Sequence, residues 1–271
     1  MGCRLLLVGC GKMGSAMLDG WLASRTVDQV VVVEPQGAFL AGAGSGSQQI
    51  IRCAGVSRIP AGFEPDVVVL AVKPQVMDEV VPGYAGFARP GTVFLSIAAG
   101  KTIDYFTARL GSDAAIVRAM PNTPASVGRG MTVAVPNASV TPEQRRLCET
   151  LLSAVGQVAW VEDEALIDAV TAVSGGGPAY VFLLIETLAK AGVAAGLPEE
   201  LAMTIARATV AGSGELAARS AEPAAVLRKN VTSPNGTTQA ALEVLMAEDG
   251  IQPLFDRAIA AATARSRELA G

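Results

Sequence analysis

The first part of the chain alternates continuous apolar runs with stretches in which apolar and polar residues recur at helical spacing. Apolar runs rich in Val, Leu and Ile without polar alternation are typical of strands buried on both faces of a parallel sheet. The pattern therefore predicts a doubly wound α/β domain over residues 1–162. The predicted strands span 4–9, 29–34, 66–72, 92–98, 114–120 and 131–136, and the predicted helices span 12–24, 74–81, 102–110 and 142–154.

The last of these helices carries a clear start signal in the sequence. Thr141 suits the N-cap position and Pro142 suits the first helical position, where its missing N–H costs nothing. Gln144 is placed to return a hydrogen bond to the N-cap backbone, so we expect a capping box.

From residue 163 to 271 the apolar runs give way to segments rich in Ala, Leu, Glu and Arg, which predict an all-helical second domain. The segment 178–195 is apolar almost all round, which is typical of a helix buried among several others. Because Glu186 and Lys190 interrupt it, we expect no membrane span there. The predicted helical segments are 178–195, 198–218 and 236–270, whereas the Gly-rich stretch 37–62 predicts no clear element.

Composition narrows the class of protein. Apolar residues make up 51% of the chain and charged residues 17%, which excludes disorder and indicates that some apolar surface is buried between subunits. The net charge of −4 and the lack of long Lys/Arg runs argue against a nucleic-acid partner. The chain has no His and its four Cys lack CxxC spacing, so we expect no metal site. We expect a cytoplasmic protein with reduced thiols.

A GxGxxG motif lies between the first predicted strand and the first predicted helix, a context that predicts a dinucleotide site. Gly9 would permit the tight turn, Gly11 would let the backbone approach the pyrophosphate, and Gly14 would let the helix pack close to the strand. The helix N-terminus would present N–H groups and its positive dipole end to the phosphates. A Gly-rich turn without a ligand is the alternative. The motif reads Gly9-Cys10-Gly11-Lys12-Met13-Gly14.

The second predicted strand ends in an acidic residue, Glu34. A carboxylate at this position can accept hydrogen bonds from both ribose hydroxyls and would repel a 2′-phosphate. We therefore expect NAD(P)H as the cofactor, with a preference for NADH. NADPH stays open because Arg52 or Arg58 can neutralise a phosphate.

The scarcity of side chains that can donate a proton narrows the class of reaction. It contains no His and few Lys, so a ketone reductase would lack its usual proton donor. An imine substrate removes this difficulty, since its nitrogen is partly protonated near neutral pH. A hydroxyl that hydrogen-bonds the nitrogen would then suffice, together with donors for any substrate carboxylate.

Four further motifs follow the Gly-rich loop, and in this order they resemble pyrroline-5-carboxylate reductase over about residues 4–269. The resemblance implies hydride transfer from NAD(P)H to the C=N bond of 1-pyrroline-5-carboxylate, giving L-proline in the last step of proline biosynthesis. It also implies a homodimer or higher homo-oligomer formed through the helical domain. The motifs are AVKPQ (71–75), MPNTPA (120–125), EALIDAVTAVSGGGPAY (164–180) and VTSPNGTT (231–238).

The resemblance also implies individual roles. Thr238 is expected to be catalytic, because its hydroxyl would hydrogen-bond the ring nitrogen while the surrounding loop holds the substrate carboxylate. Asn122 would form part of the pocket floor near the nicotinamide. The implied cofactor contacts are Gly9, Cys10, Gly11, Lys12, Met13, Gly14, Glu34, Ala71, Val72, Lys73, Pro74, Ile97, Ala98, Ala99 and Asn230, and the implied substrate contacts are Asn122, Glu164, Ser233, Pro234, Asn235, Gly236, Thr237 and Thr238.

The chain departs from the family pattern at two positions. Gly176 stands where the family usually has Ser, which leaves the tight turn intact but removes one hydroxyl. Asn235 stands where the family usually has Gly. Because Asn tolerates left-handed backbone angles, we expect the loop to keep its shape.

Simpler interpretations stay open: Thr238 as an N-cap residue, Glu164 as a first-turn acid, and Lys73 as a solvated side chain. A β-hydroxyacid dehydrogenase shares the architecture, but it would place a lysine early in the helix after the glycine run. This chain offers none there before Lys190. A dinucleotide-sensing protein of the same fold would bind the cofactor without turnover.

Overall fold

The computed structural model describes residues 3–35 and 49–270, and the chain divides into two compact units. The first unit comprises Met1–Gly175 and Ala262–Gly271, and the second comprises Gly176–Ala261. The units therefore do not divide at residue 162, where the strand pattern ends. The reason is that the first helix of the helical region packs on the sheet, where Ile167 is buried with Val133 and Val135.

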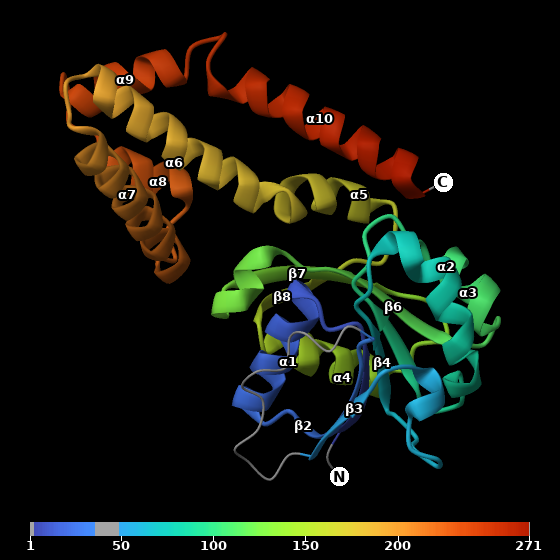
Figure 1. Ribbon diagram of the computed structural model, residues 1–271. Helices are drawn as coiled ribbons and strands as arrows, with labels where there is room; N and C mark the ends of the chain where they lie inside the picture. The colour runs from blue at the N-terminus through green and yellow to red at the C-terminus, as the bar shows by residue number, and fades with distance from the viewer. Residues whose placement is uncertain (1–2, 36–48, 271) are drawn as a thin grey trace. The chain divides into compact units, whose positions relative to one another are not determined.

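An eight-stranded sheet forms the centre of the first unit (Figure 1), in the order β3-β2-β1-β4-β5-β6-β7-β8. Neighbouring strands run parallel except for β6 and β7, which are antiparallel. Their connection is too short for a helical crossover, which a parallel pair needs. The strands are β1 (Cys3–Val8), β2 (Val27–Val33), β3 (Gln49–Cys53), β4 (Val67–Leu70), β5 (Val93–Ser96), β6 (Ala115–Met120), β7 (Gly130–Pro136) and β8 (Gly156–Trp160).

Helices cover both faces of the sheet (Figure 1), which confirms the doubly wound α/β prediction. On one face Trp21 is fully buried, and its indole N–H donates to the carbonyl oxygen of Leu151 at 2.8 Å. On the other face Met77 and Phe106 are fully buried. The first face carries α1 (Lys12–Ser24) and α4 (Pro142–Ser153), and the second carries α2 (Met77–Val80) and α3 (Ile103–Leu110).

Strand β1 shows why the apolar runs lack polar alternation. Leu5 and Leu7 enter the core on the α1 side, whereas Leu6 and Val8 enter the core on the α3 side. All four side chains are buried. Both faces of the strand are therefore dry, as the sequence pattern predicts for a central parallel strand.

The two strands that the sequence pattern missed, β3 and β8, are the edges of the sheet. Only Cys53 is buried in β3, and no residue of β8 is fully buried. Edge strands of this kind are partly solvated, so neither carries a continuous apolar run. β3 and the 3₁₀ turn Val56–Arg58 lie in the stretch 37–62 that predicted no element, and residues 37–48 of that stretch lie outside the described residues.

The helix predicted at 74–81 is only partly present. The α-helical part is limited to Met77–Val80, with 3₁₀ turns at Pro74–Val76 and Val81–Phe87 on either side. Pro82 has no N–H to donate, so a regular helix cannot continue through it.

The second unit consists of helices. The segment predicted as one helix over 236–270 divides in two between Leu245 and Ile251. At Gly250 a Cβ would collide with the carbonyl oxygen of Leu245, so the tight turn between the two helices needs a glycine there. The helices are α6 (Gly177–Ala194), α7 (Glu199–Arg219), α8 (Ala224–Asn230), α9 (Thr237–Leu245) and α10 (Ile251–Ala270), whose last turns belong to the first unit.

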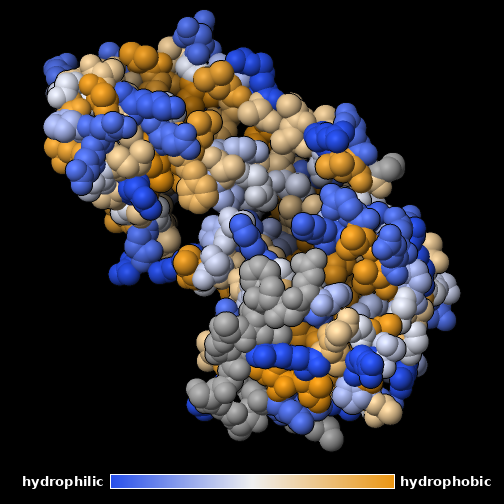
Figure 2. All heavy atoms as spheres, in the orientation of Figure 1, coloured by the Kyte–Doolittle hydropathy of each residue, from blue (hydrophilic) through white to orange (hydrophobic). Residues whose placement is uncertain are grey.

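Helix α6 keeps much of its apolar surface uncovered within this chain. Phe182 and Leu183 are each 59% exposed, although the sequence predicted a helix buried among several others. Figure 2 shows apolar side chains among the surface atoms of this unit. The stretch Leu166–Ala194 is also long and apolar enough, by length and composition, to cross a membrane. Glu186 and Lys190 alone therefore do not exclude a membrane span in this stretch, contrary to the expectation from the sequence.

The capping box predicted at the start of α4 is confirmed. The Gln144 N–H donates to Thr141 Oγ1 at 3.2 Å, and the Thr141 N–H donates to Gln144 Oε1 at 2.9 Å. Pro142 follows the N-cap, as predicted.

Replacing Thr141 by Ala is expected to lower the free energy of unfolding of the first unit by about 1 kcal/mol, because an N-cap acceptor is lost. Urea unfolding followed by tryptophan fluorescence measures this, since Trp21 and Trp160 both lie in the first unit. Thr150→Ala is the control, because the exposed Thr150 hydroxyl only donates to the Arg146 carbonyl within the same helix. Equal losses in both variants would contradict the prediction.

Candidate active site

The carboxyl ends of four parallel strands meet at one edge of the sheet, and predicted cofactor residues follow each of them. Gly9 follows β1, Glu34 follows β2, Ala71 follows β4 and Ile97 follows β5. The strand order reverses between β1 and β4, and open α/β sheets bind ligands at such switch points. Backbone hydrogen bonds extend the ladders into this edge: Gly9 N to Val33 O at 2.9 Å, Ala71 N to Val8 O at 2.8 Å, and Ile97 N to Leu70 O at 3.2 Å.

Two glycines of the motif are required by the packing of the protein itself. Gly9 has a φ of +89°, and a Cβ there would lie 2.7 Å from Val72 Cγ1. A Cβ on Gly14 would lie 2.5 Å from the carbonyl oxygen of Gly9. Gly9 therefore makes the tight turn, and Gly14 lets α1 approach β1, as the motif predicts.

Gly11 is different, because nothing in the described part of the chain requires it to be glycine. A Cβ there would meet no atom within 4 Å, and its φ of −71° suits any residue. Gly11 is the N-cap of α1, which has no side-chain cap and no acidic residue in its first turn. Open space beside helix N–H groups that no described side chain caps fits the pyrophosphate of a dinucleotide.

Glu34 lies beside the same loop. Its Oε2 accepts a hydrogen bond from the Cys10 N–H at 2.9 Å, and its own N–H donates to the Cys53 carbonyl at 3.1 Å. In a dinucleotide-binding fold this is where an acidic residue reaches the ribose hydroxyls. Burial, with the Glu34 carboxylate nearby, raises the pKa of the Cys10 thiol to about 11. The thiol is therefore neutral near pH 7 and adds no charge beside the phosphates.

The segments after β4 and β5 complete this edge. The Ala71 backbone and the Val72 side chain lie against Gly9, and Ala71 Cβ lies beside Gly14. The Ala98 N–H donates to Ser96 Oγ at 3.3 Å, which shapes the turn after β5. The structure thus brings together the motif and the residues after β1, β2 and β4. Lys73 is exposed and starts the turn at Pro74, and Ala99 is half-buried in the segment after β5.

Asn122 has a structural role that the sequence did not reveal. Its Nδ2 donates to the carbonyl oxygen of Ser174 at 3.3 Å and to Ser174 Oγ at 3.2 Å. Its Oδ1 accepts the Met131 N–H at 2.9 Å. Asn122 therefore ties the loop after β6 to the π-helical turn Thr171–Gly175. Its place in the substrate pocket stays a prediction.

Glu164 is engaged with a residue that sequence reasoning missed. Its Oε1 accepts the Arg118 Nη1–H at 2.7 Å and the Ile103 N–H at 2.9 Å. Arg118 lies in β6, and its one signal in the sequence is its position as a lone charge inside an apolar strand. Because α5 (Leu166–Val170) begins two residues later, Glu164 precedes that helix and instead faces the N-terminus of α3.

The loop SPNGTT runs into the start of α9. Asn235 has a φ of +58°, so the left-handed conformation expected of it is confirmed. The Gly236 N–H donates to the Ser233 carbonyl at 3.0 Å. Gly236 is the N-cap and α9 begins at Thr237, which excludes Thr238 as the N-cap residue. No side chain in the described ranges caps this helix, so its first N–H groups are available to an anion.

Asn230 belongs to the same unit as this loop. It ends α8, and its Nδ2 donates to Glu222 Oε2 at 3.2 Å. The contact holds the amide against the residue before Pro223, and the cofactor role of Asn230 stays a prediction.

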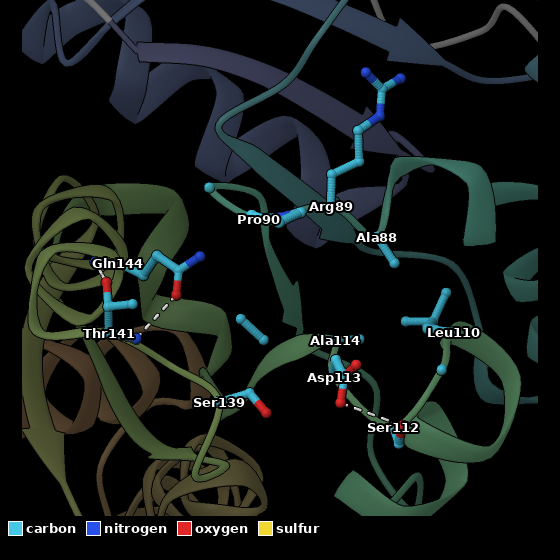
Figure 3. A pocket seen from close by; sticks show the side chains of 13 residues that line it. Ala88, Arg89, Pro90, Leu110, Ser112, Asp113, Ala114, Ser139, Thr141 and Gln144 are labelled. Atoms are coloured by element: carbon cyan, nitrogen blue, oxygen red, sulfur yellow. Dashed lines mark hydrogen bonds between the residues drawn. The ribbon is translucent and has the colours of Figure 1, made fainter.

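A hollow of about 550 Å³ lies at the amino edge of the sheet (Figure 3). Two of its polar side chains have partners, since Arg89 pairs with Glu64 at 2.7 Å and Gln144 belongs to the capping box. None of the predicted site residues lines it. The predicted cofactor residues of the first unit therefore gather at the carboxyl edge of its sheet, and the predicted substrate loop precedes α9 in the second unit.

Comparison with known proteins identifies relatives that match this chain along its whole length. Residues 164–269 match the pyrroline-5-carboxylate reductase dimerisation family, and residues 4–100 match the family of coenzyme F420-dependent NADP oxidoreductases. A pyrroline-5-carboxylate reductase of a Synechocystis species is 42% identical, with 99% of each chain covered. A solved pyrroline-5-carboxylate reductase from Coxiella burnetii has a TM-score of 0.91 at 32% identity, covering 100% of both chains. The Plasmodium falciparum pyrroline carboxylate reductase with NADP bound has a TM-score of 0.79 at 28% identity, covering 99% of this chain and 98% of its own.

Gly11→Ala is expected to weaken binding of both NADH and NADPH by about tenfold or more, because the added methyl group occupies the space beside the pyrophosphate. Its melting temperature should fall far less than that of Gly14→Ala, since the Cβ meets no protein atom and only an N-cap glycine is lost. Gly14→Ala is the contrasting variant and should lose thermal stability through its clash with Gly9. Cofactor fluorescence titration and thermal melting measure the two effects. Wild-type affinity in Gly11→Ala would refute the phosphate assignment.

Proposed function

The chain belongs to the pyrroline-5-carboxylate reductase family, and from this premise we propose how its residues reduce 1-pyrroline-5-carboxylate to L-proline with NAD(P)H. The reaction is the reduction of a cyclic imine by an oxidoreductase in the last step of proline biosynthesis. The observation that carries it is similarity to curated reductases along the whole chain, from the Gly-rich loop to the loop before α9.

The bound cofactor supplies the hydride. On this chain the N-terminus of α1 and the loop Gly9–Gly14 would hold the pyrophosphate, and Glu34 would accept the ribose hydroxyls. The segments Ala71–Pro74 and Ile97–Ala99 would border the cofactor further along the carboxyl edge. This assignment is supported by the position of the residues after β1, β2, β4 and β5, which all lie at the carboxyl edge of the sheet.

The substrate would be held by the loop Ser233–Thr238. The N–H groups at the start of α9 are suited to its carboxylate, because the helix dipole favours an anion there. The half-buried Thr238 hydroxyl would hydrogen-bond the ring nitrogen and align the C=N carbon for hydride attack. The nitrogen keeps the proton of the iminium form, so no strong acid is needed, in keeping with a chain that has no His.

The enzyme acts on a small molecule as a homo-oligomer, and we place its subunit contact in the helical domain. Residues 164–269 match a dimerisation family, and α6 carries exposed Phe182 and Leu183. A second subunit covering this surface explains an apolar helix better than a membrane does, because the same chain carries a complete nucleotide-binding fold. The proposed partners are therefore the small-molecule substrate and further copies of this chain, and not nucleic acid or a membrane.

A cytoplasmic location is part of the same proposal. The four cysteines are all free and buried, which suits a reducing compartment. Cys148, for example, lies in the sheet core with a pKa that burial raises to about 12.

Thr238→Val is expected to lower kcat by about tenfold or more, because the hydroxyl that accepts the iminium N–H and aligns the reacting carbon is lost. Thr238→Ser keeps the hydroxyl and should retain most of the activity. Thr204→Val is the matched control, since the exposed Thr204 only donates to the Glu200 carbonyl on α7. The measurement is loss of reduced-cofactor absorbance with 1-pyrroline-5-carboxylate. Wild-type turnover in Thr238→Val would rule out this role.

Glu34→Ser is expected to raise the ratio of NADPH-dependent to NADH-dependent turnover, because a carboxylate that repels the 2′-phosphate is removed. Glu149→Ser makes the same change of charge on the exposed face of α4 and should leave the ratio unchanged. The ratio is measured from kcat/KM with each cofactor under the same conditions. An unchanged ratio in Glu34→Ser would contradict the expected preference for NADH.

A further inference from the structure

A charged side chain lies buried inside the sheet of the first unit. Arg118 on β6 is 3% exposed, and its register partner on β5 is Ser96, which is also fully buried. The neighbouring alternate residue Ile116 packs on the face covered by α3, so Arg118 extends on that face. A buried guanidinium is unfavourable unless it is paired, so its presence in an apolar strand requires a specific partner.

That partner is Glu164, one carboxylate oxygen of which accepts hydrogen bonds from both Arg118 and the backbone of Ile103. Its Oε1 lies 2.7 Å from Arg118 Nη1 and 2.9 Å from the backbone nitrogen of Ile103. Ile103 is the first residue of α3, so the carboxylate also lies at the positive end of a helix dipole. Among the residues that the structure describes, Arg118 Nη2 has no hydrogen-bond partner. Glu164 is therefore the counter-charge on which this guanidinium depends.

The hydrogen bond from the Ile103 N–H to Glu164 fixes one end of a segment that we assign to the border of the cofactor. The segment Ile97–Thr102 connects β5 to α3. At its β5 end the Ala98 N–H donates to Ser96 Oγ at 3.3 Å. At its α3 end the Ile103 N–H donates to Glu164. Between them, Gly100 lies so close to the backbone of Leu269 that a Cβ would sit 3.0 Å from its carbonyl oxygen.

Other contacts of the first unit hold Glu164 in place. Asp168, one helical turn further along, accepts the Ser266 hydroxyl at 2.7 Å and lies 3.9 Å from Arg267. Ile167 is buried against β7. The chain around Glu164 is thus anchored by contacts other than its carboxylate. The carboxylate can therefore hold the start of α3 in place, rather than being held in place by α3.

We propose that Glu164 and Arg118 are positioning residues, which set the place of the segment Ile97–Thr102 at the nicotinamide, and that Glu164 does not itself contact the substrate. The inference rests on the proposed function, because Ile97–Ala99 are assigned there to the cofactor border. Its consequence is that the pair acts on hydride transfer and cofactor binding, and leaves substrate binding largely unchanged.

Two double variants isolate the contact to α3. Arg118→Met/Glu164→Gln and Arg118→Met/Glu164→Leu both lack the buried ion pair, and replacing such a pair by uncharged groups of similar size is often neutral for stability. They differ in whether position 164 can accept the Ile103 N–H. At matched melting temperatures, kcat of the Leu variant is expected to fall about tenfold below that of the Gln variant. The KM for 1-pyrroline-5-carboxylate should stay within about twofold of the wild type.

Two results would overturn the proposal. Equal kcat in the two double variants would show that the bond to Ile103 has no positioning role. A raised substrate KM at unchanged kcat in the Leu variant would show that Glu164 touches the substrate. Glu143→Gln, which removes the exposed partner of Arg146 on α4, is the control for loss of an ion pair and should behave as the wild type.

Two further measurements keep the test decisive. Arg118→Lys keeps the charge without apolar repacking, and it should lower kcat at unchanged substrate KM even where the double variants unfold. If the wild type itself shows no turnover, the proposed function fails, and fluorescence titration with NADH then tests the positioning claim separately. The Leu variant should bind NADH about threefold more weakly than the Gln variant. Equal affinities would overturn the proposal.

Discussion

The close approach of α1 to β1 is the constraint on which the nucleotide site depends. Gly14 lies so near the Gly9 carbonyl that no side chain fits between them, and the turn at Gly9 requires a positive φ. This approach aims the first N–H groups of α1 at the carboxyl edge of the sheet. It also places the loop within reach of Glu34, which accepts the Cys10 N–H. One packing requirement thus builds the proposed phosphate-binding and ribose-binding parts of the site together.

The second unit follows a different rule, because its helices bury little apolar surface within one chain. In α6 only Ala189 is fully buried, whereas Phe182 and Leu183 face outward. A helix of this composition gains its stability from the surface that covers it. Because this unit matches a dimerisation family, we expect its stability to rise with protein concentration. The unit that carries the proposed substrate loop is also the unit that matches the dimerisation family.

The sequence predicted those features whose cause is local. The helix at 12–24, the capping box of Thr141 and Gln144, and the left-handed Asn235 all follow from short-range chemistry, and the structure contains each of them. The edge strands β3 and β8 were missed because partial solvation gives them no continuous apolar run. The antiparallel pairing of β7 depends on the length of a connection and on strand order, which periodicity does not encode.

The long-range polar contacts were equally beyond the sequence. Arg118 and Glu164 are 46 residues apart, and Asn122 and Ser174 are 52 residues apart. Composition shows that such groups exist, but only the fold shows which of them meet. The central claim is imine reduction, and it is tested most directly by incubating the purified protein with 1-pyrroline-5-carboxylate and NADH or NADPH while following reduced-cofactor absorbance and proline formation. The account predicts turnover in which each cofactor oxidised yields one proline. Cofactor binding without turnover in either reaction would contradict it.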